Sequence, residues 1–155
     1  MKKYIKLGSG ALAILAVVFM FFTQVVDVTD VKTSIGVKAV IPTEFTINNL
    51  GYKGTGIGLA GYILLGVAGI IMLLVALIPY LKEHDVLGMV VMGVAVICAV
   101  LGIIFIFLIR KNFMETNGHI SGDVYVGWAA ITAGSLGSLS AAGGITSIVL
   151  DLLEK

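Results

Sequence analysis

The chain has 155 residues, of which 59% are hydrophobic and only 12% are charged. A soluble domain is about half apolar and about a quarter charged, so this composition excludes an ordinary soluble domain and predicts an integral membrane protein. The net charge of +1 excludes a strongly basic nucleic-acid surface and an acidic tail, and nucleic acid is not expected as a partner.

Four charge-free apolar stretches are long enough to cross the hydrocarbon core of a bilayer, which takes about 20 helical residues. They cover residues 7–26, 57–81, 86–109 and 124–150. Because water is absent at that depth, each stretch must satisfy its backbone hydrogen bonds internally, and the absence of strand alternation favours helices over barrel strands. We therefore expect one all-α membrane domain, residues 1–155, with four transmembrane helices and with membrane lipid as a partner of the protein.

Three lysines precede the first stretch, in the basic-then-apolar order of a secretory signal. The apolar part is longer than a usual signal core and no small-residue cleavage site follows it, so we expect a retained first span, with a cleaved signal as the alternative. These lysines favour the cytoplasm of a plasma-membrane protein for the N-terminus and, with an even number of spans, for the C-terminus. Counted over the whole chain, five basic residues would lie on each side, so the lysines before the first span are given the greater weight. The expected interface anchors are Tyr80 inside and Tyr125 and Trp128 outside.

The first outer loop, residues 27–56, is the longest polar segment and is predicted to be β-prone. Hydrophobic and polar residues alternate at residues 26–29, 35–39 and 44–48, which predicts two or three short strands with a break at Thr33-Ser34. An isolated hairpin is only marginally stable in water, so these strands require the second outer loop or a neighbouring copy as a pairing partner. An irregular loop is the alternative.

The other connections carry little chemistry. The inner turn, residues 82–85, forces a tight antiparallel hairpin, and the second outer loop, residues 110–123, is polar and turn-rich. His84 and His119 lie among carboxylates but lack the spacing of zinc ligands, so solvated residues are expected, with a metal site between subunits as the alternative. Cys98 lies alone in the third span. We therefore expect no enzyme activity, no cofactor and no metal.

A glycine motif opens the second span. Residues 56–61, GIGLAG, match the nucleotide-binding pattern G-x-G-x-x-G, but they lead into a membrane span and no acidic residue follows at the required distance. We interpret such small residues as sites of close helix contact. This second packing set comprises Gly54 and Gly58 at the second span and Ala95, Ala99 and Gly102 in the third.

The fourth span is rich in small residues, which occupy 16 of the 21 positions from Gly127 to Ser147. Two rows recur at every fourth position: Ala129, Ala133, Gly137 and Ala141, and Ala130, Gly134, Ser138, Ala142 and Thr146. Small rows allow close backbone approach, so protein or water is expected over this helix rather than lipid. The segment is then a seam between copies or the lining of a pore, and the alternative is a tight monomeric bundle. Gly137→Leu is expected to disrupt assembly or bundle packing.

The layout of four spans, a β-prone first outer loop and a short inner turn resembles that of claudin-type junction proteins and some large-pore channels. The likeness is one of topology, because the first outer loop lacks the paired cysteines and the tryptophan of a claudin. No charge lies inside a span, which disfavours a pump or transporter. We expect a non-enzymatic homo-oligomer that forms a pore or channel. The alternatives are a structural or adhesive scaffold and an accessory subunit of a larger membrane complex.

Overall fold

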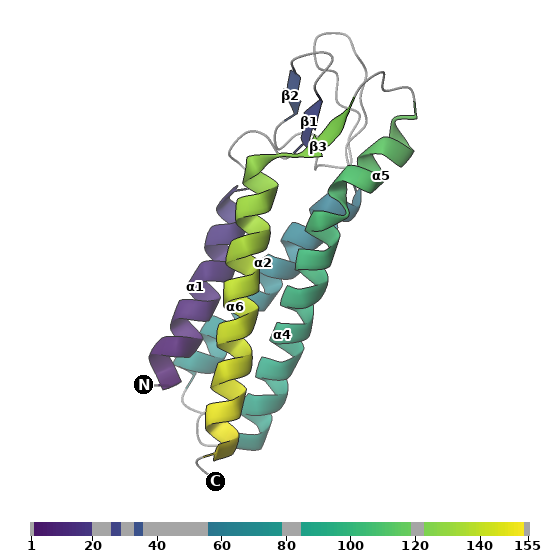
Figure 1. The fold of residues 1–155 in the computed structure, drawn as a ribbon. Helices are drawn as coiled ribbons and strands as arrows, with labels where there is room; N and C mark the ends of the chain where they lie inside the picture. The colour runs from purple at the N-terminus through teal and green to yellow at the C-terminus, as the bar shows by residue number, and fades with distance from the viewer. Residues whose placement is uncertain are drawn as a thin grey trace.

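A computed structural model describes residues 2–19, 26–28, 33–35, 56–78, 85–118 and 123–153. Within these residues four long helices lie side by side: α1 (Lys2–Val18), α2 (Gly56–Leu77), α4 (Asp85–Phe107) and α6 (Trp128–Leu153). Consecutive helices run in opposite directions, and both chain ends lie at the same end of the bundle (Figure 1). Helices dominate the described chain, and the fold is all-α in class, as the sequence predicts.

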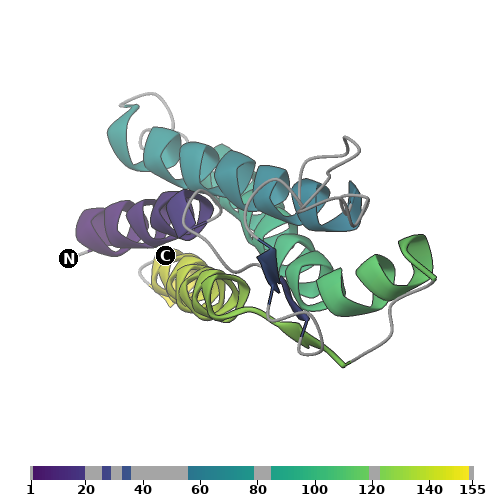
Figure 2. The ribbon, with the colours of Figure 1, turned by 90° about the horizontal axis from the view of Figure 1, so that it is seen from above.

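Three helices in the described chain are long and apolar enough to cross a membrane: α2, the segment Val86–Phe107 of α4, and α6. These helices support insertion of the protein into a membrane. The first helix, α1, has 17 residues, one of which is Lys6, and it is less apolar than α2 and α4. It contacts α2 on one side and α6 on the other (Figure 2).

The four long helices form a closed ring, because α1 and α4 each pack against both α2 and α6. Glycines bring two pairs of backbones close together. A Cβ atom added to Gly61 would lie 2.9 Å from the carbonyl oxygen of Gly102, and one added to Gly69 would lie 3.0 Å from that of Gly10. The last glycine of the GIGLAG segment therefore makes a close contact between α2 and α4.

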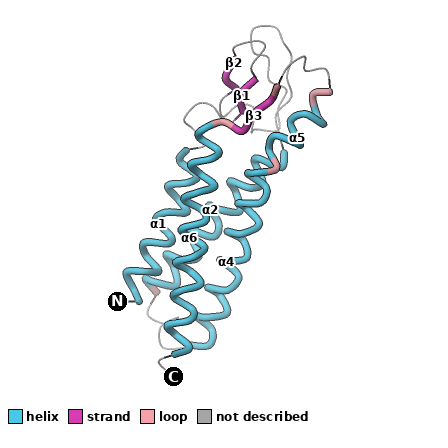
Figure 3. Tube along the Cα trace, in the orientation of Figure 1, coloured by secondary structure: helices cyan, strands magenta, loops and turns pink. Residues whose placement is uncertain are grey.

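A small sheet lies at the end of the bundle away from the chain termini (Figure 3). It consists of β1 (Val26–Val28), β2 (Thr33–Ile35) and β3 (Val124–Val126), in the order β2-β1-β3, with both pairs antiparallel. In the β1–β3 pair Val26 lies opposite Val126. Thr33-Ser34, interpreted above as a break, is instead part of β2. The other residues of the first outer loop that were predicted to form strands lie outside the described residues.

Several boundaries differ from the sequence prediction. The expected first span ends at residue 26, but α1 ends at Val18 and Val26 belongs to β1. The expected fourth span begins at residue 124, but Val124–Val126 forms β3 and α6 begins only at Trp128. Both differences have the same cause: hydropathy scores valine as apolar in a helix or a strand alike, whereas β-branched side chains favour pairing in a sheet.

The second outer loop also differs, because it contains a helix, α5 (Ile109–Thr116), that was not expected. The third span ends at Phe107 rather than residue 109, and α5 begins immediately after a turn at Leu108. Ile109 and Phe113, one helical turn apart, are buried and hold α5 against the bundle. Gly54, Tyr80, His84 and His119 lie outside the described residues.

Candidate association face of helix α6

The small residues of α6 divide into an inner and an outer set. Six of the nine predicted packing residues are buried against other helices of the same chain: Ala129, Ala130, Ala133, Gly134, Gly137 and Ala141. The other three, Ser138, Ala142 and Thr146, are exposed on the surface of the bundle. The inner set therefore serves the packing of one chain, and only the outer set is available to a second protein or to lipid.

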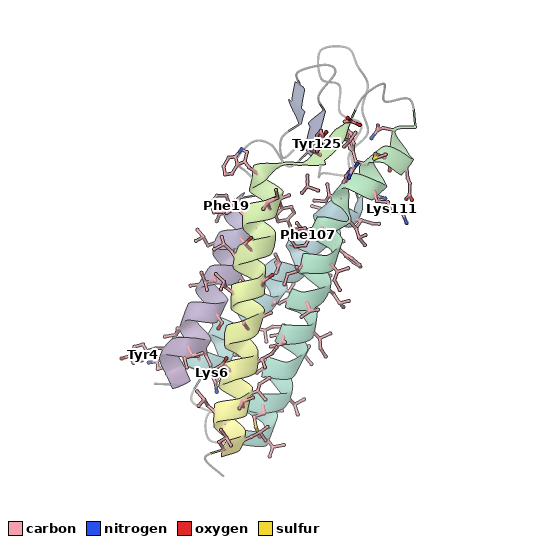
Figure 4. All side chains as sticks on the ribbon, viewed as in Figure 1. Tyr4, Lys6, Phe19, Phe107, Lys111 and Tyr125 are labelled. Atoms are coloured by element: carbon pink, nitrogen blue, oxygen red, sulfur yellow. The ribbon has the colours of Figure 1, made fainter. Side chains whose placement is uncertain are left out.

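Glycines of the inner set accommodate bulky side chains of α4. A Cβ atom at Gly134 would lie 2.6 Å from the ring of Phe107, and one at Gly137 would lie 3.0 Å from Ile103 and 3.1 Å from Leu65 of α2. Phe107 is labelled in Figure 4. Gly137→Leu would thus disturb the bundle of a single chain, and this substitution cannot distinguish assembly from folding.

A buried hydrogen bond joins α6 to α1. The Ser140 hydroxyl donates to the carbonyl oxygen of Ser9 at 2.7 Å, while the Ser9 hydroxyl donates to the carbonyl oxygen of Ile5 at 2.8 Å. A Cβ atom at Gly143 would overlap the Ser9 hydroxyl oxygen. The two helices therefore approach closely at this level, and the hydroxyls are satisfied without water.

Two more contacts join α1 and α6, one toward each end of the pair, and Figure 4 labels one residue of each, Lys6 and Phe19. At one end Lys6 Nζ lies 2.7 Å from Asp151 Oδ2, with each side chain only 15% exposed. At the other end the rings of Phe19 and Trp128 meet edge to face, with centroids 6.0 Å apart. Sequence reasoning missed the ion pair because 145 positions separate its partners. The signal was present, since the predicted even number of spans places both residues at the same end of the bundle.

We expect Asp151→Asn to lower the free energy of unfolding of the detergent-solubilised protein by about 1 kcal/mol, the usual net contribution of an intramolecular hydrogen bond. Thermal melting would measure the change, and exchange of the two charges, Lys6→Asp with Asp151→Lys, should recover part of it. The exposed pair Lys111–Glu115, at 3.8 Å, is the control, and Glu115→Gln should change stability little. A loss as large in Glu115→Gln would contradict a specific role for the Lys6–Asp151 pair.

The outward face of α6 differs from those of its neighbours. Exposed side chains on α2 and α4 are mostly large, for example Ile63, Ile70 and Leu74 on α2 and Val94 and Ile97 on α4. On α6 the central outward positions are instead small or hydroxylated: Ser135, Ser138, Ala142 and Thr146. Large exposed side chains border them: Ile131, Leu139, Ile145 and Val149.

The hydroxyls on this face are bonded within their own helix. Thr132, Ser135, Ser138 and Thr146 each donate to the carbonyl oxygen four residues earlier, at distances from 2.8 to 2.9 Å. Such back-bonding removes the need for a water partner. The face is therefore compatible with close contact to apolar protein surface, although it is rich in oxygen atoms.

The remaining predicted site residues that the structure describes are four small buried residues and two exposed aromatic residues. Gly58, Ala95, Ala99 and Gly102 are buried, and Gly102 packs against Gly61 and Leu65 of α2. Tyr125 and Trp128 are exposed near the sheet. In the described part of the chain, no three His, Cys, Asp or Glu side chains lie close enough together to hold a metal ion.

The fold and this face define a helical membrane protein in which the small-residue helix α6 packs one side against its own bundle and leaves the other side exposed. The chain matches no protein-family model, no curated protein and no solved structure. Its function is therefore inferred from its own residues and their arrangement.

Proposed function

We propose that this protein is a non-enzymatic, four-span membrane protein that self-associates through the outward face of α6 and acts as a structural scaffold. The observation that carries the proposal is the exposed row Ser138, Ala142 and Thr146, spaced by four residues in a helix whose inner small residues are already used. Small residues in such a row allow the backbones of two membrane helices to approach closely.

In this proposal α1 also crosses the membrane, in addition to the three longer helices α2, α4 and α6. At about 1.5 Å of rise per residue, its helix covers about 26 Å of a hydrocarbon core of about 30 Å. It lies within the same ring as the three longer helices and is fastened to α6 at both ends. We place both termini in the cytoplasm of a plasma-membrane protein, with the sheet and a β-prone first loop outside.

The hydroxyl geometry favours a scaffold over a channel. A pore lining offers its polar groups to water and to the permeant species. Here the outward hydroxyls of Ser135, Ser138 and Thr146 already donate to their own helix. A face of this kind gains more from close packing against another helix, where dispersion and weak Cα–H hydrogen bonds act over the whole contact.

Ala142→Leu is the test of this proposal. Because Ala142 is exposed in the single chain, a larger side chain should leave the bundle folded and hold two copies apart. We expect that about tenfold more variant than wild-type protein is needed in the vesicles to reach the same energy transfer between labelled copies. This difference corresponds to about 1.4 kcal/mol. The matched control is Ala11→Leu, the same change at an exposed position of α1, which should have no effect. Equal behaviour of the two variants would remove the α6 assignment.

Flux through the same vesicles separates the alternatives. Solute or ion flux that depends on the wild-type chain would favour a pore between copies over a scaffold. A chain that remains monomeric at all densities in vesicles would instead favour an accessory subunit, whose α6 face binds a different membrane protein.

A further inference from the structure

A groove of about 380 Å³ lies along the outward side of α5, at the end of the bundle that carries the sheet. Four exposed residues line it: Arg110, Lys111, Met114 and Glu115. Its volume is near the lower end of the usual range for ligand sites, about 300–1,000 Å³. We propose that this groove binds the headgroup phosphate of an anionic phospholipid.

The charges in the groove suit a phosphate group. Arg110 has no ion pair within the described residues, and its planar guanidinium matches the geometry of phosphate oxygens. Lys111 lies 3.8 Å from Glu115, and these two side chains are 75% and 61% exposed, so this pair is weak and leaves the lysine accessible. With two cations and one anion, the lining carries a net positive charge.

The position of the groove selects a lipid rather than a soluble anion. The hydrogen bonds from Leu108 N to Ile104 O and from Asn112 N to Leu108 O continue the helical path from α4 into α5. Ile104, Leu108 and Lys111 recur at helical spacing, so they share one side of this path. Ile104 and Leu108 are exposed apolar residues at the end of a helix long enough to cross a membrane.

An anionic phospholipid could therefore place its acyl chains along α4 and its phosphate beside α5. In Figure 4 Lys111 projects away from the bundle axis, above the apolar side chains of α4. Met114 adds an apolar surface within the groove, suited to the glycerol backbone of a lipid. The site requires α4 to cross the bilayer, but it does not require self-association through α6.

The test places the full chain in nanodiscs of phosphatidylcholine containing phosphatidylglycerol. Native mass spectrometry then identifies the lipids that stay bound to the protein after the protein is released from the nanodisc. Wild type should retain phosphatidylglycerol selectively, and Arg110→Gln with Lys111→Gln should weaken that retention by about tenfold or more, because each basic residue near a membrane surface contributes about fivefold. Both residues are exposed, so the melting temperature should not change.

Two controls make the result specific. Lys2→Gln with Lys3→Gln removes the same two charges at the start of α1, at the end of the bundle away from the groove, and should weaken retention less than the Arg110 and Lys111 variant. Added inorganic phosphate should fail to displace the retained lipid. The proposal would be overturned if the Arg110 and Lys111 variant retained as much phosphatidylglycerol as wild type. It would also be overturned if the Lys2 and Lys3 variant lost as much as the Arg110 and Lys111 variant, or if inorganic phosphate displaced the lipid.

Discussion

Gly102→Leu is expected to force α2 and α4 apart and to lower the free energy of unfolding by about 3 kcal/mol, the upper part of the range for overpacked cores. A Cβ atom at Gly102 would lie 2.8 Å from the carbonyl oxygen of Gly61 and 3.1 Å from the backbone nitrogen of Leu65. Both neighbours are backbone atoms of α2, so no side-chain rotation can relieve the overlap. The whole helix must move.

Denaturant or thermal unfolding of the detergent-solubilised chain would measure this loss. Gly93→Leu is the matched control, because Gly93 lies in the same helix with no atom within 4 Å of its added Cβ position. It should retain at least the wild-type stability, since leucine is also the better helix former. Similar losses in both variants would mean that glycine matters to α4 for backbone reasons and not for its contact with α2.

The second large effect is expected at the α1–α6 contact. Gly143→Ala places a methyl group onto the Ser9 hydroxyl oxygen and should cost about 2 kcal/mol. In a Ser9→Ala background the same change should cost far less, because the added Cβ would then meet the Cβ of residue 9 at 3.4 Å, an ordinary contact. The carbonyl of residue 9 remains as the acceptor for Ser140.

A double-mutant cycle on these two positions isolates the steric coupling. We expect a coupling energy of about 1 kcal/mol or more between Ser9→Ala and Gly143→Ala, measured by unfolding in the same detergent. Strictly additive effects would show that the two helices are further apart in solution than in the described structure.

The sequence predicted α2, α4 and α6 as apolar helices long enough to cross a membrane, because the absence of charge over about 20 residues is a strong physical constraint there. It failed at the ends of helices near the sheet. Val26 and Val124 are apolar and continuous with apolar stretches, but they form paired strands in the structure. Only their long-range pairing decides between helix and strand, and this information is not local in the sequence.

Helix α5 was missed for a related reason. Its composition is polar, and the two residues that fix it, Ile109 and Phe113, were assigned to the end of a span and to a loop. Their spacing of four residues was the available signal. The polar, turn-forming residues of the same segment favoured a loop instead.

For α6 the sequence indicated how the helix packs but did not identify all of its partners. Small residues at every fourth position predicted close packing, and in the structure Gly134 faces Phe107 of α4 while Gly137 faces Ile103 of α4 and Leu65 of α2. Which neighbour covers each row depends on the rotation of the helix in the bundle. That rotation is set by tertiary contacts such as Ser140 with Ser9, which no local pattern encodes.

The ring of helices brings α1 and α6 together, although they are far apart in the sequence. Lys6 pairs with Asp151, and the carbonyl oxygen of Ser9 accepts a hydrogen bond from Ser140, so these α1 residues meet α6 partners that are made 145 and 131 residues later. During synthesis, the flank of α1 that packs against α6 therefore stays uncovered until α6 has been made. A truncated product lacking α6 would keep that flank open, making it a natural substrate for membrane quality control.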